Sequence, residues 1–225
     1  MLTREIKRVF LVDDHPLMRR GLRLLIESEH DFCVCGEASN AEEAIEKMPL
    51  SDPDLAIIDI SLPGTSGLDL LKYLQISMSK VKKLVLSRHD ESLYAERAIR
   101  AGAKGYVMKS EAPEMVIKAL RRIDAGAVYV SSVMNERLLQ GIASGHQAFN
   151  DSPLEVLSDR ELEVFEMTGR GIGTREIAEI LKLSVKTIES YRARVKSKLN
   201  LANASELMQH AVQWVESERY VSPLI

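Results

Sequence analysis

The sequence predicts an α/β domain with a doubly wound five-stranded parallel sheet, then a linker, then an all-α domain of four helices. Up to about residue 125, short apolar runs alternate with amphipathic helical patterns. Residues 144–153 are polar and rich in helix breakers, as in a linker. Beyond them only helical periodicity remains. We therefore expect domains at 1–125 and 154–225, joined by a linker at 126–153 with a connecting helix over 132–142.

Five short runs rich in branched apolar residues are typical of buried strands in a parallel sheet. They occupy residues 9–12, 32–37, 55–58, 84–86 and 105–108. A helical pattern follows each run, with Pro16 suited to a first turn and Ser39 or Asn40, then Asp90, suited to capping. In the flavodoxin-like strand order, strands one and three are neighbours at the point where the order reverses.

Three carboxylates follow these two strands, with Asp13 and Asp14 after the first and Asp59 after the third. Ligands bind beyond the carboxyl ends of strands in such sheets. Carboxylates gathered there need a cation to stay ionised. Oxygen ligands with room for water and phosphate favour Mg²⁺, with Mn²⁺ a substitute. We expect these three side chains, and the backbone carbonyl of Ser61, to be the metal ligands.

A carboxylate can also be a nucleophile toward phosphorus, giving an aspartyl-phosphate. Asp59, central at the sheet edge, is the predicted nucleophile. Ser87 ends the fourth strand and Lys109 the fifth, where a hydroxyl and a cation would bind phosphoryl oxygens. Taken alone, Ser87 has a simpler explanation as a strand terminator, and Lys109 as a surface lysine. Their occurrence at successive strand ends favours a common site.

Residues 8–124 resemble a two-component receiver domain of the CheY-like type. The matching residues are Asp13-Asp14, the segment 59–67, Ser87, and Tyr106 three residues before Lys109. The resemblance implies that a histidine kinase or a small phosphodonor phosphorylates Asp59. It also implies that Ser87 and Tyr106 move together to report the phosphate. Arg88 departs from the small residue that receivers generally carry there, and it could crowd or tune the site.

The second domain has the signals of a helix-turn-helix. Ser158 and Glu161 form a capping-box pattern. Thr174 is the expected cap of a short helix, and Ser184 caps the next, over 185–199, after a tight turn. From 182 to 198 there are six basic residues and only one acid, Glu189, in a chain of net charge −3. This local charge favours binding to DNA phosphates over a merely solvated face.

Residues 157–214 resemble the LuxR-type effector domain, and a receiver with this effector makes up the NarL/FixJ family of response regulators. The matching segments are 157–161, 174–178, 183–184, 187–189 and 198–199. The resemblance implies that the major groove is faced by Lys186, Glu189, Ser190 and Ala193. It implies that DNA phosphates are contacted mainly by Thr187, Arg192, Arg194, Lys196 and Lys198. It further implies a dimer contact on the last helix, near Gln209, Val212 and Gln213.

Composition limits the cellular setting. No apolar run approaches the roughly 20 residues that span a bilayer, and residues 1–8 are too polar for a signal peptide. The only two cysteines, Cys33 and Cys35, are expected to be buried apolar residues of a strand. A metal site with His30 is disfavoured because no second Cys/His pair exists. We expect a cytoplasmic protein without a membrane partner.

These observations predict a transcriptional regulator whose dimerisation and sequence-specific DNA binding depend on Mg²⁺-dependent phosphorylation of Asp59. Expected partners are a histidine kinase, double-stranded DNA, a second copy of the chain and, as a further candidate, RNA polymerase. The inactive receiver would mask the recognition helix or the dimer surface. We expect no enzymatic activity beyond self-phosphorylation and dephosphorylation.

Three alternatives stay open at this point. One is a phosphatase like the haloacid dehalogenase group, although its nucleophile would follow the first strand. Another is a module that binds protein partners through the helix-turn-helix. The third keeps the fold but makes control independent of phosphate.

Overall fold

A computed structural model describes residues 6–89, 91–111, 113–143 and 153–221. The chain divides into two compact units, residues 1–143 and 144–225. The predicted domain borders at 125 and 153 stay predictions, but the connecting helix α6 (Ser132–Ala143) lies within the first compact unit.

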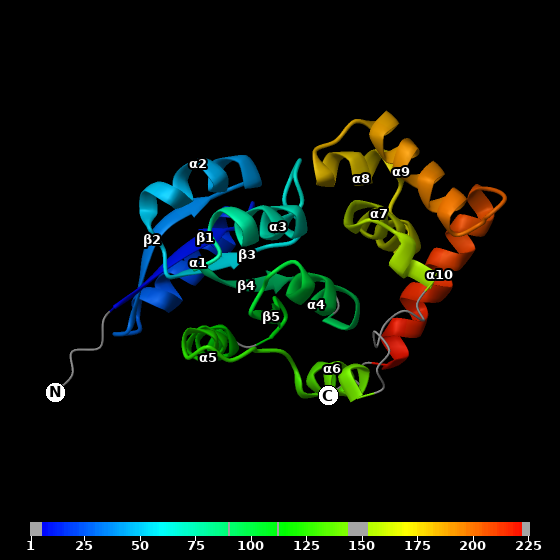
Figure 1. Cartoon of the computed structure of the whole chain (residues 1–225). Coiled ribbons are helices and arrows are strands. Elements are labelled where there is room, and N and C mark those ends of the chain that lie inside the picture. Colours follow the sequence, from blue (N-terminus) through cyan, green and yellow to red (C-terminus); the bar gives the residue numbers. More distant parts are fainter. Residues whose placement is uncertain (1–5, 90, 112, 144–152, 222–225) are drawn as a thin grey trace. The chain divides into compact units, whose positions relative to one another are not determined.

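The first unit contains a five-stranded sheet in the order β2-β1-β3-β4-β5, with every pairing parallel (Figure 1). Its strands are β1 (Lys7–Val12), β2 (Phe32–Ala38), β3 (Leu55–Ile58), β4 (Lys82–Ser87) and β5 (Gly105–Met108). The predicted fold class is confirmed, and β1 and β3 are neighbours as the flavodoxin-like order requires.

Five helices alternate with these strands. They are α1 (Pro16–Glu27), α2 (Ala41–Ser51), α3 (Gly67–Ser77), α4 (Glu91–Arg100) and α5 (Pro113–Asp124). Pro16 occupies the first turn of α1, and the Asn40 side chain caps α2 by accepting from the Glu43 amide at 2.8 Å. Asp90, the expected cap of α4, lies outside the described residues.

The core of the first unit follows from the alternation of side chains along each strand. Val9 and Leu11 of β1 pack with Leu22 of α1 and Leu120 of α5 in one buried cluster. Helices α2 and α3 lie on the opposite side of the sheet (Figure 1). The sheet thus buries both faces and leaves the carboxyl edge of its strands for chemistry.

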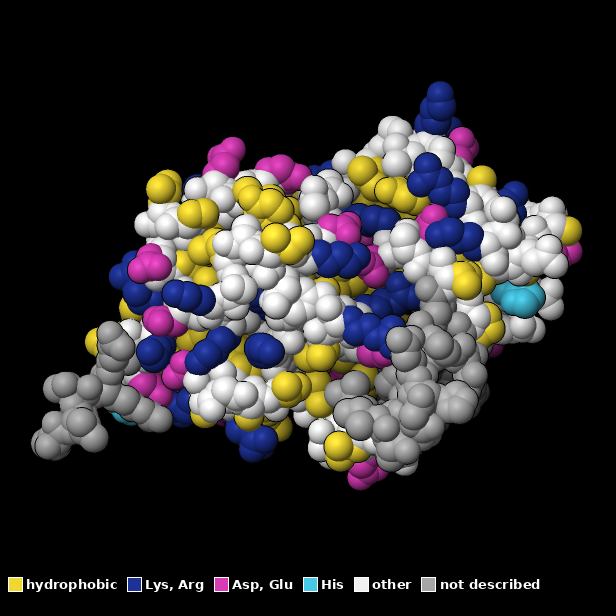
Figure 2. Space-filling view, in the orientation of Figure 1, with side chains coloured by type: hydrophobic (Ala, Val, Ile, Leu, Met, Phe, Trp, Pro, Cys, Tyr) yellow, Lys and Arg dark blue, Asp and Glu magenta, His cyan; other side chains and the backbone are white. Residues whose placement is uncertain are grey.

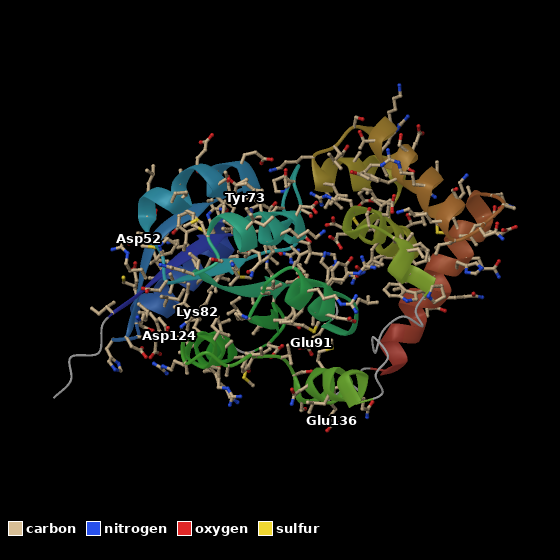
Figure 3. The ribbon with its side chains drawn as sticks, in the orientation of Figure 1. Asp52, Tyr73, Lys82, Glu91, Asp124 and Glu136 are labelled. Carbon is tan, nitrogen blue, oxygen red and sulfur yellow. The ribbon has the colours of Figure 1, made fainter. Side chains whose placement is uncertain are left out.

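Polar contacts also close the opposite edge of the sheet, where the strands begin. Lys82, at the start of β4, donates to Asp124 at the end of α5, with Nζ 3.0 Å from Oδ1 (Figure 3). The backbone amide of Lys82 donates to the Asp54 carbonyl at 3.0 Å. These contacts hold the start of β4 to α5 and to the start of β3.

The cysteines are not buried as expected. Cys33 and Cys35 are free and half-buried, because β2 is an edge strand of the sheet.

The segment after α5 pairs with the other edge strand. Tyr129 forms a parallel bridge with Gly105, its carbonyl accepting from the Tyr106 amide at 2.8 Å and its amide donating to the Lys104 carbonyl at 2.9 Å. A Cβ on Gly105 would lie 3.0 Å from the Tyr129 carbonyl oxygen, so glycine permits this approach. Ser131 then donates through its amide to Glu91 of α4 at 2.8 Å.

The second unit is helical throughout its described residues, as predicted. It contains a short 3₁₀ turn η1 (Pro153–Val156) and the helices α7 (Asp159–Gly169), α8 (Thr174–Leu181), α9 (Val185–Lys198) and α10 (Ala204–Val221). Val164, Ile177 and Ile188 form a common core from α7, α8 and α9. Trp214 of α10 contacts the ring of Phe165, with centroids 5.9 Å apart.

The packing of α7 against α10 depends on Gly169. A Cβ there would lie 2.2 Å from the Ala211 carbonyl oxygen, a backbone atom that cannot move alone. We expect Gly169→Ala to lower the free energy of unfolding of the second unit by about 1–3 kcal/mol. The measurement is urea unfolding followed by the fluorescence of Trp214, the single tryptophan.

A matched control is Gly21→Ala in α1, where nothing lies within 4 Å of the added Cβ. It should stabilise the first unit by about 0.5–1 kcal/mol through helix propensity and leave the unfolding of the second unit, which Trp214 reports, unchanged. Equal effects of the two substitutions would contradict the packing argument.

Candidate functional site

Two aspartates and a lysine meet at the carboxyl edge of the sheet. Asp59 follows β3 and donates through its amide to the Val12 carbonyl at 2.8 Å, which aligns the ends of β3 and β1. Lys109 Nζ lies 2.6 Å from Asp13 Oδ2 and 2.6 Å from Asp59 Oδ2. Asp13 and Asp59 are each only 2% exposed. The structure thus brings Asp59 together with Asp13, 46 residues earlier in the chain, and with Lys109, 50 residues later.

Asp14 and His15 complete this acidic cluster. Oxygens of Asp13, Asp14 and Asp59, with a ring nitrogen of His15, all lie within 4.8 Å of one another. Asp14 Oδ1 is buried and accepts no hydrogen bond, although His15 Nδ1 approaches it to 2.6 Å. Three carboxylates gathered this closely fit a hard divalent cation such as Mg²⁺. The sequence analysis did not assign His15 to the site.

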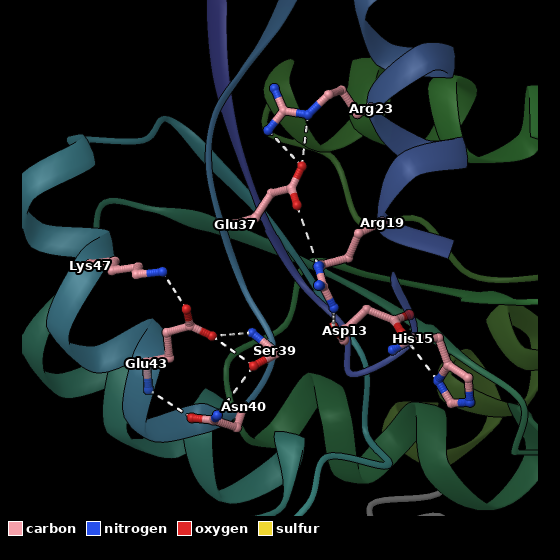
Figure 4. Close-up of polar contacts among 9 residues, drawn as sticks. All are labelled: Asp13, His15, Arg19, Arg23, Glu37, Ser39, Asn40, Glu43 and Lys47. Atoms are coloured by element: carbon pink, nitrogen blue, oxygen red, sulfur yellow. Dashed lines mark hydrogen bonds and ion pairs between the residues drawn. The ribbon is translucent and has the colours of Figure 1, made fainter. Parts of the chain in front are cut away.

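The loop between β1 and α1 is fixed by a chain of ionic contacts (Figure 4). Asp13 Oδ1 accepts from the His15 amide at 2.8 Å, and its backbone carbonyl accepts from Arg19. Arg19 also reaches Glu37 of β2, which is bound in turn by Arg23. The position of Asp13 is therefore set by backbone and side chains together.

The environment of Asp59 disfavours its charge. Burial raises the pKa of the Asp59 carboxyl, and the nearby Asp13 raises it further, whereas Lys109 opposes both effects. Asp59 Oδ1 also accepts from the Ser61 amide at 3.2 Å. A cation at the cluster would favour the ionised, nucleophilic form.

Ser87 and Tyr106 lie beside the cluster and are both buried. Ser87 Oγ accepts from the His89 amide at 3.1 Å, and the Tyr106 hydroxyl donates to the His89 carbonyl at 2.8 Å. The Ser87 carbonyl in turn accepts from the Lys109 amide at 2.7 Å, which aligns the ends of β4 and β5. Arg88 is exposed.

His89 is a second residue of this site that sequence reasoning missed. Its Nε2 lies 2.7 Å from Ser61 Oγ, and its ring stacks on Tyr94. The only local signal is its position two residues after Ser87, which did not predict contacts with distant loops.

The helix-turn-helix presents an exposed face on α9. Ser184 caps α9 by accepting from the Thr187 amide at 3.0 Å, and Ile188 and Val195 are buried beneath the helix. The residues predicted to face the groove are all exposed: Lys186, Glu189, Ser190 and Ala193. Lys and Arg side chains stand out around α9 (Figure 2). The helices of the second unit therefore leave this face of α9 uncovered.

Arg192 is engaged within the domain. Its Nη1 donates to Thr174 Oγ1 at 2.6 Å, joining α9 to the start of α8. The prediction that Thr174 caps α8 is wrong, because Gly173 occupies the cap position and Thr174 is the first helical residue. The Thr174 hydroxyl thus binds Arg192 and does not cap α8.

The other candidates for phosphate contact differ in exposure. Arg194 is exposed, with its guanidinium 5.8 Å from the centre of the Tyr191 ring. Lys196 and Thr187 are half-buried, and the Thr187 hydroxyl lies 2.7 Å from Ser184 Oγ. Arg194 is therefore more accessible than Lys196.

Lys198 has a structural partner. Its Nζ donates to Glu161 Oε2 at 2.6 Å, and the same oxygen accepts from the Ser158 amide at 2.8 Å. The capping box of α7 predicted from the sequence is present, and it also binds the end of α9. Burial alone would raise the pKa of Glu161, but the bonds from Lys198 and Ser158 outweigh it and lower that pKa.

On α10, the predicted dimer residues lie at the surface. Gln209 and Gln213 are exposed, and Val212 is half-buried. Met208, one turn before Val212, is 36% exposed. Their role in a dimer stays a prediction.

Comparisons with known proteins agree with this geometry. Residues 9–121 match the family model of the response regulator receiver domain, and residues 155–211 match that of bacterial regulatory proteins of the luxR family. The response regulator UvrY of Escherichia coli (strain K12) is 36% identical over 91% of this chain and 93% of UvrY. The chain belongs to the NarL/FixJ family of response regulators.

Other members of the family and solved structures extend the similarity over nearly the whole chain. The oxygen regulatory protein NreC of Staphylococcus carnosus (strain TM300) is 33% identical over 92% of this chain and 97% of NreC. RcsB from Salmonella enterica serovar Typhimurium, bound to promoter rprA with the phosphomimetic BeF3−, is 27% identical. That match covers 92% of this chain and 99% of RcsB, with a TM-score of 0.62.

As a family member, the chain is a two-component response regulator with a LuxR-type DNA-binding domain that regulates transcription. This output favours a regulator over the phosphatase and the protein-binding module considered above. Among the described residues, no helix is both long and apolar enough to cross a membrane.

The Lys198–Glu161 pair should stabilise the second unit. Because the pKa of Glu161 is lowered by folding, its contribution is present above the unfolded-state pKa and is lost as the pH falls through the folded-state pKa. We expect Lys198→Met to lower the free energy of unfolding by about 1 kcal/mol at pH 7, since the lysine is partly exposed. Unfolding by urea across pH 3 to 7 measures this.

Lys186→Met is the matched control, because Lys186 is exposed on the same helix. It should leave stability within about 0.5 kcal/mol of the wild type. A Lys198→Met loss that does not shrink at acid pH would argue against the ion pair.

Proposed function

We propose that Asp59 accepts a phosphoryl group from a histidine kinase or a small phosphodonor, and that this controls dimerisation and DNA binding through α9. The observation that carries the proposal is the pair of 2.6 Å contacts that Lys109 makes with Asp13 and Asp59. They support it because a fixed positive charge lies against Asp59, where phosphoryl charge would develop in the proposed reaction.

In the proposed reaction, an Asp59 oxygen attacks phosphorus while the bond from phosphorus to the donor nitrogen or oxygen breaks, and the electron pair leaves with the donor. Lys109 neutralises phosphoryl oxygens, and the Ser87 hydroxyl can donate to one of them. Hydrolysis of the acyl phosphate returns Asp59 and inorganic phosphate.

Mg²⁺, or Mn²⁺ in its place, would be held by Asp13, Asp14, Asp59 and the Ser61 carbonyl. It would supply positive charge for the phosphoryl oxygens. The gathering of oxygens from Asp13, Asp14 and Asp59 within 4.8 Å of one another supports this assignment.

Phosphorylation adds about −1.5 to −2 charges beside Ser87 and Tyr106. It shifts the receiver between conformations only as far as these differ in affinity for the added group. We propose that the unphosphorylated receiver limits access to α9 or to the dimer residues of α10. We also propose that the protein acts in the cytoplasm.

The acceptor is tested with Mg²⁺ and acetyl phosphate, followed by separation of phosphorylated protein on a phosphate-affinity gel. We expect wild-type protein to form an acid-labile adduct and Asp59→Asn to form none. Lys109→Gln should slow formation at least tenfold, because a charge in contact with the nucleophile is lost. Lys104→Gln, an exposed lysine, serves as control. An adduct of equal yield on Asp59→Asn would refute the proposal.

The DNA-binding face is tested with a duplex selected from a random library. We expect Arg194→Ala to weaken binding and to reduce the slope of log affinity against log salt by about 1, because Arg194 is an exposed, predicted phosphate contact. Glu189→Gln should instead change the preferred base at one position. Lys118→Ala in α5 is the control. Salt-independent binding would contradict a phosphate interface.

A further inference from the structure

Strand β2 contains one residue more than the part of β1 that it pairs with. Val9 pairs with Val34, whereas Phe10 pairs with Gly36, so Cys35 is the extra residue of a β-bulge. In a regular strand, side chains alternate between the two faces of the sheet. A bulge interrupts this alternation and re-aims the side chains that follow it.

The bulge turns Glu37 toward α1. Val34 packs in the cluster that contains Leu22 of α1, and a residue three positions later in a regular strand would face away from that helix. Glu37 instead reaches α1, where its Oε1 accepts from Arg23 Nε at 2.7 Å and its Oε2 lies 3.4 Å from Arg19 Nε (Figure 4). The side chains of Arg19 and Glu37 are only 17% and 28% exposed, so solvent screens this contact less than one at the open surface.

Arg19 in turn binds the backbone between the two aspartates proposed as metal ligands. Its Nη1 donates to the Asp13 carbonyl at 2.5 Å, and this carbonyl belongs to the peptide group that joins Asp13 to Asp14. The Asp13 amide donates to the carbonyl of Ala38, the residue after Glu37, at 3.2 Å. The end of β2 therefore fixes the Asp13 backbone twice, once directly and once through Arg19. The orientation of this peptide group determines where the two carboxylates point.

We propose that Glu37 and Arg19 are positioning residues of the divalent-cation site. Glu37 orients the guanidinium of Arg19, and the guanidinium fixes the peptide group between Asp13 and Asp14. Neither side chain touches the reacting atoms. The proposal rests on the proposed function, in which Asp13 and Asp14 hold Mg²⁺. It also gives the bulge in β2 a role, because the bulge brings Glu37 to α1.

Charge alone predicts the opposite effect of Arg19. A guanidinium near the site repels a divalent cation, so its loss would tighten cation binding if charge were its only contribution. If Arg19 acts by positioning the peptide group, its loss weakens cation binding. The sign of the change in affinity therefore distinguishes the two roles.

The test measures Mn²⁺ binding to the full chain by electron paramagnetic resonance of the free ion, with Mg²⁺ as competitor. We expect Arg19→Met to weaken Mn²⁺ binding about 10-fold, as is common for residues that orient metal ligands. Arg19→Lys should also weaken it, because the charge stays but a single nitrogen replaces the fork that reaches both Glu37 and the Asp13 carbonyl.

Glu37→Leu should weaken Mn²⁺ binding by a similar factor. Combined with Arg19→Met, it should add little, because both substitutions act through the same contact. Glu37→Gln keeps an oxygen that can accept from Arg19, so binding should return to within about threefold of wild type. Thermal melting shows which variants fold, and Arg19→Lys replaces Arg19→Met in the comparison if the latter does not melt cooperatively.

Arg20→Met is the matched control, because Arg20 is an exposed neighbour on α1 and its loss removes the same charge. It should leave Mn²⁺ affinity within about twofold of wild type. Tighter binding by Arg19→Met, or equal effects at Arg19 and Arg20, would overturn the positioning role. Wild-type protein that binds no Mn²⁺ would refute the metal site itself. Protein that binds Mn²⁺ but forms no adduct with acetyl phosphate would refute only the acceptor role of Asp59.

Discussion

The first unit depends on the neutralisation of two buried carboxylates by one buried lysine. Asp13 and Asp59 end adjacent strands, so their charges are forced together by the parallel sheet. Lys109 supplies the compensating charge from the end of β5. Removing one member of such a group leaves an uncompensated buried charge. The free energy lost is then larger than the free energy that the intact pair contributes to stability. The arrangement is therefore sensitive to any added charge, as a switch requires.

This sensitivity explains why the surrounding contacts are so closely specified. The loop carrying Asp13 is tied to β2 through Arg19 and Glu37, and the loop carrying Asp59 is tied to β4 through Ser61 and His89. In the second unit one carboxylate likewise has two partners. Glu161 accepts from the Ser158 amide at the cap of α7 and from Lys198 at the end of α9. Each unit fixes its functional element with polar groups that also satisfy helix or strand ends.

The sequence was sufficient for the features set by local pattern. Strand ends and helix caps such as Asn40, Ser158 and Ser184 were predicted because apolar periodicity and capping chemistry are local. The roles of His89 and Lys198 were not, because their partners lie in segments 28 and 37 residues away. Thr174 was misassigned for the same reason: whether a hydroxyl caps its own helix or meets Arg192 depends on how the helices pack.

The bridge between Tyr129 and β5 has a consequence for how the receiver can be isolated. Without that segment, β5 would become an open edge whose amides at Tyr106 and carbonyls at Lys104 lack partners. Unpaired edges recruit other strands and promote association between chains. A fragment cut after α5 would therefore be more prone to aggregate, whereas one that extends through α6 would keep the β5 edge paired at Tyr129.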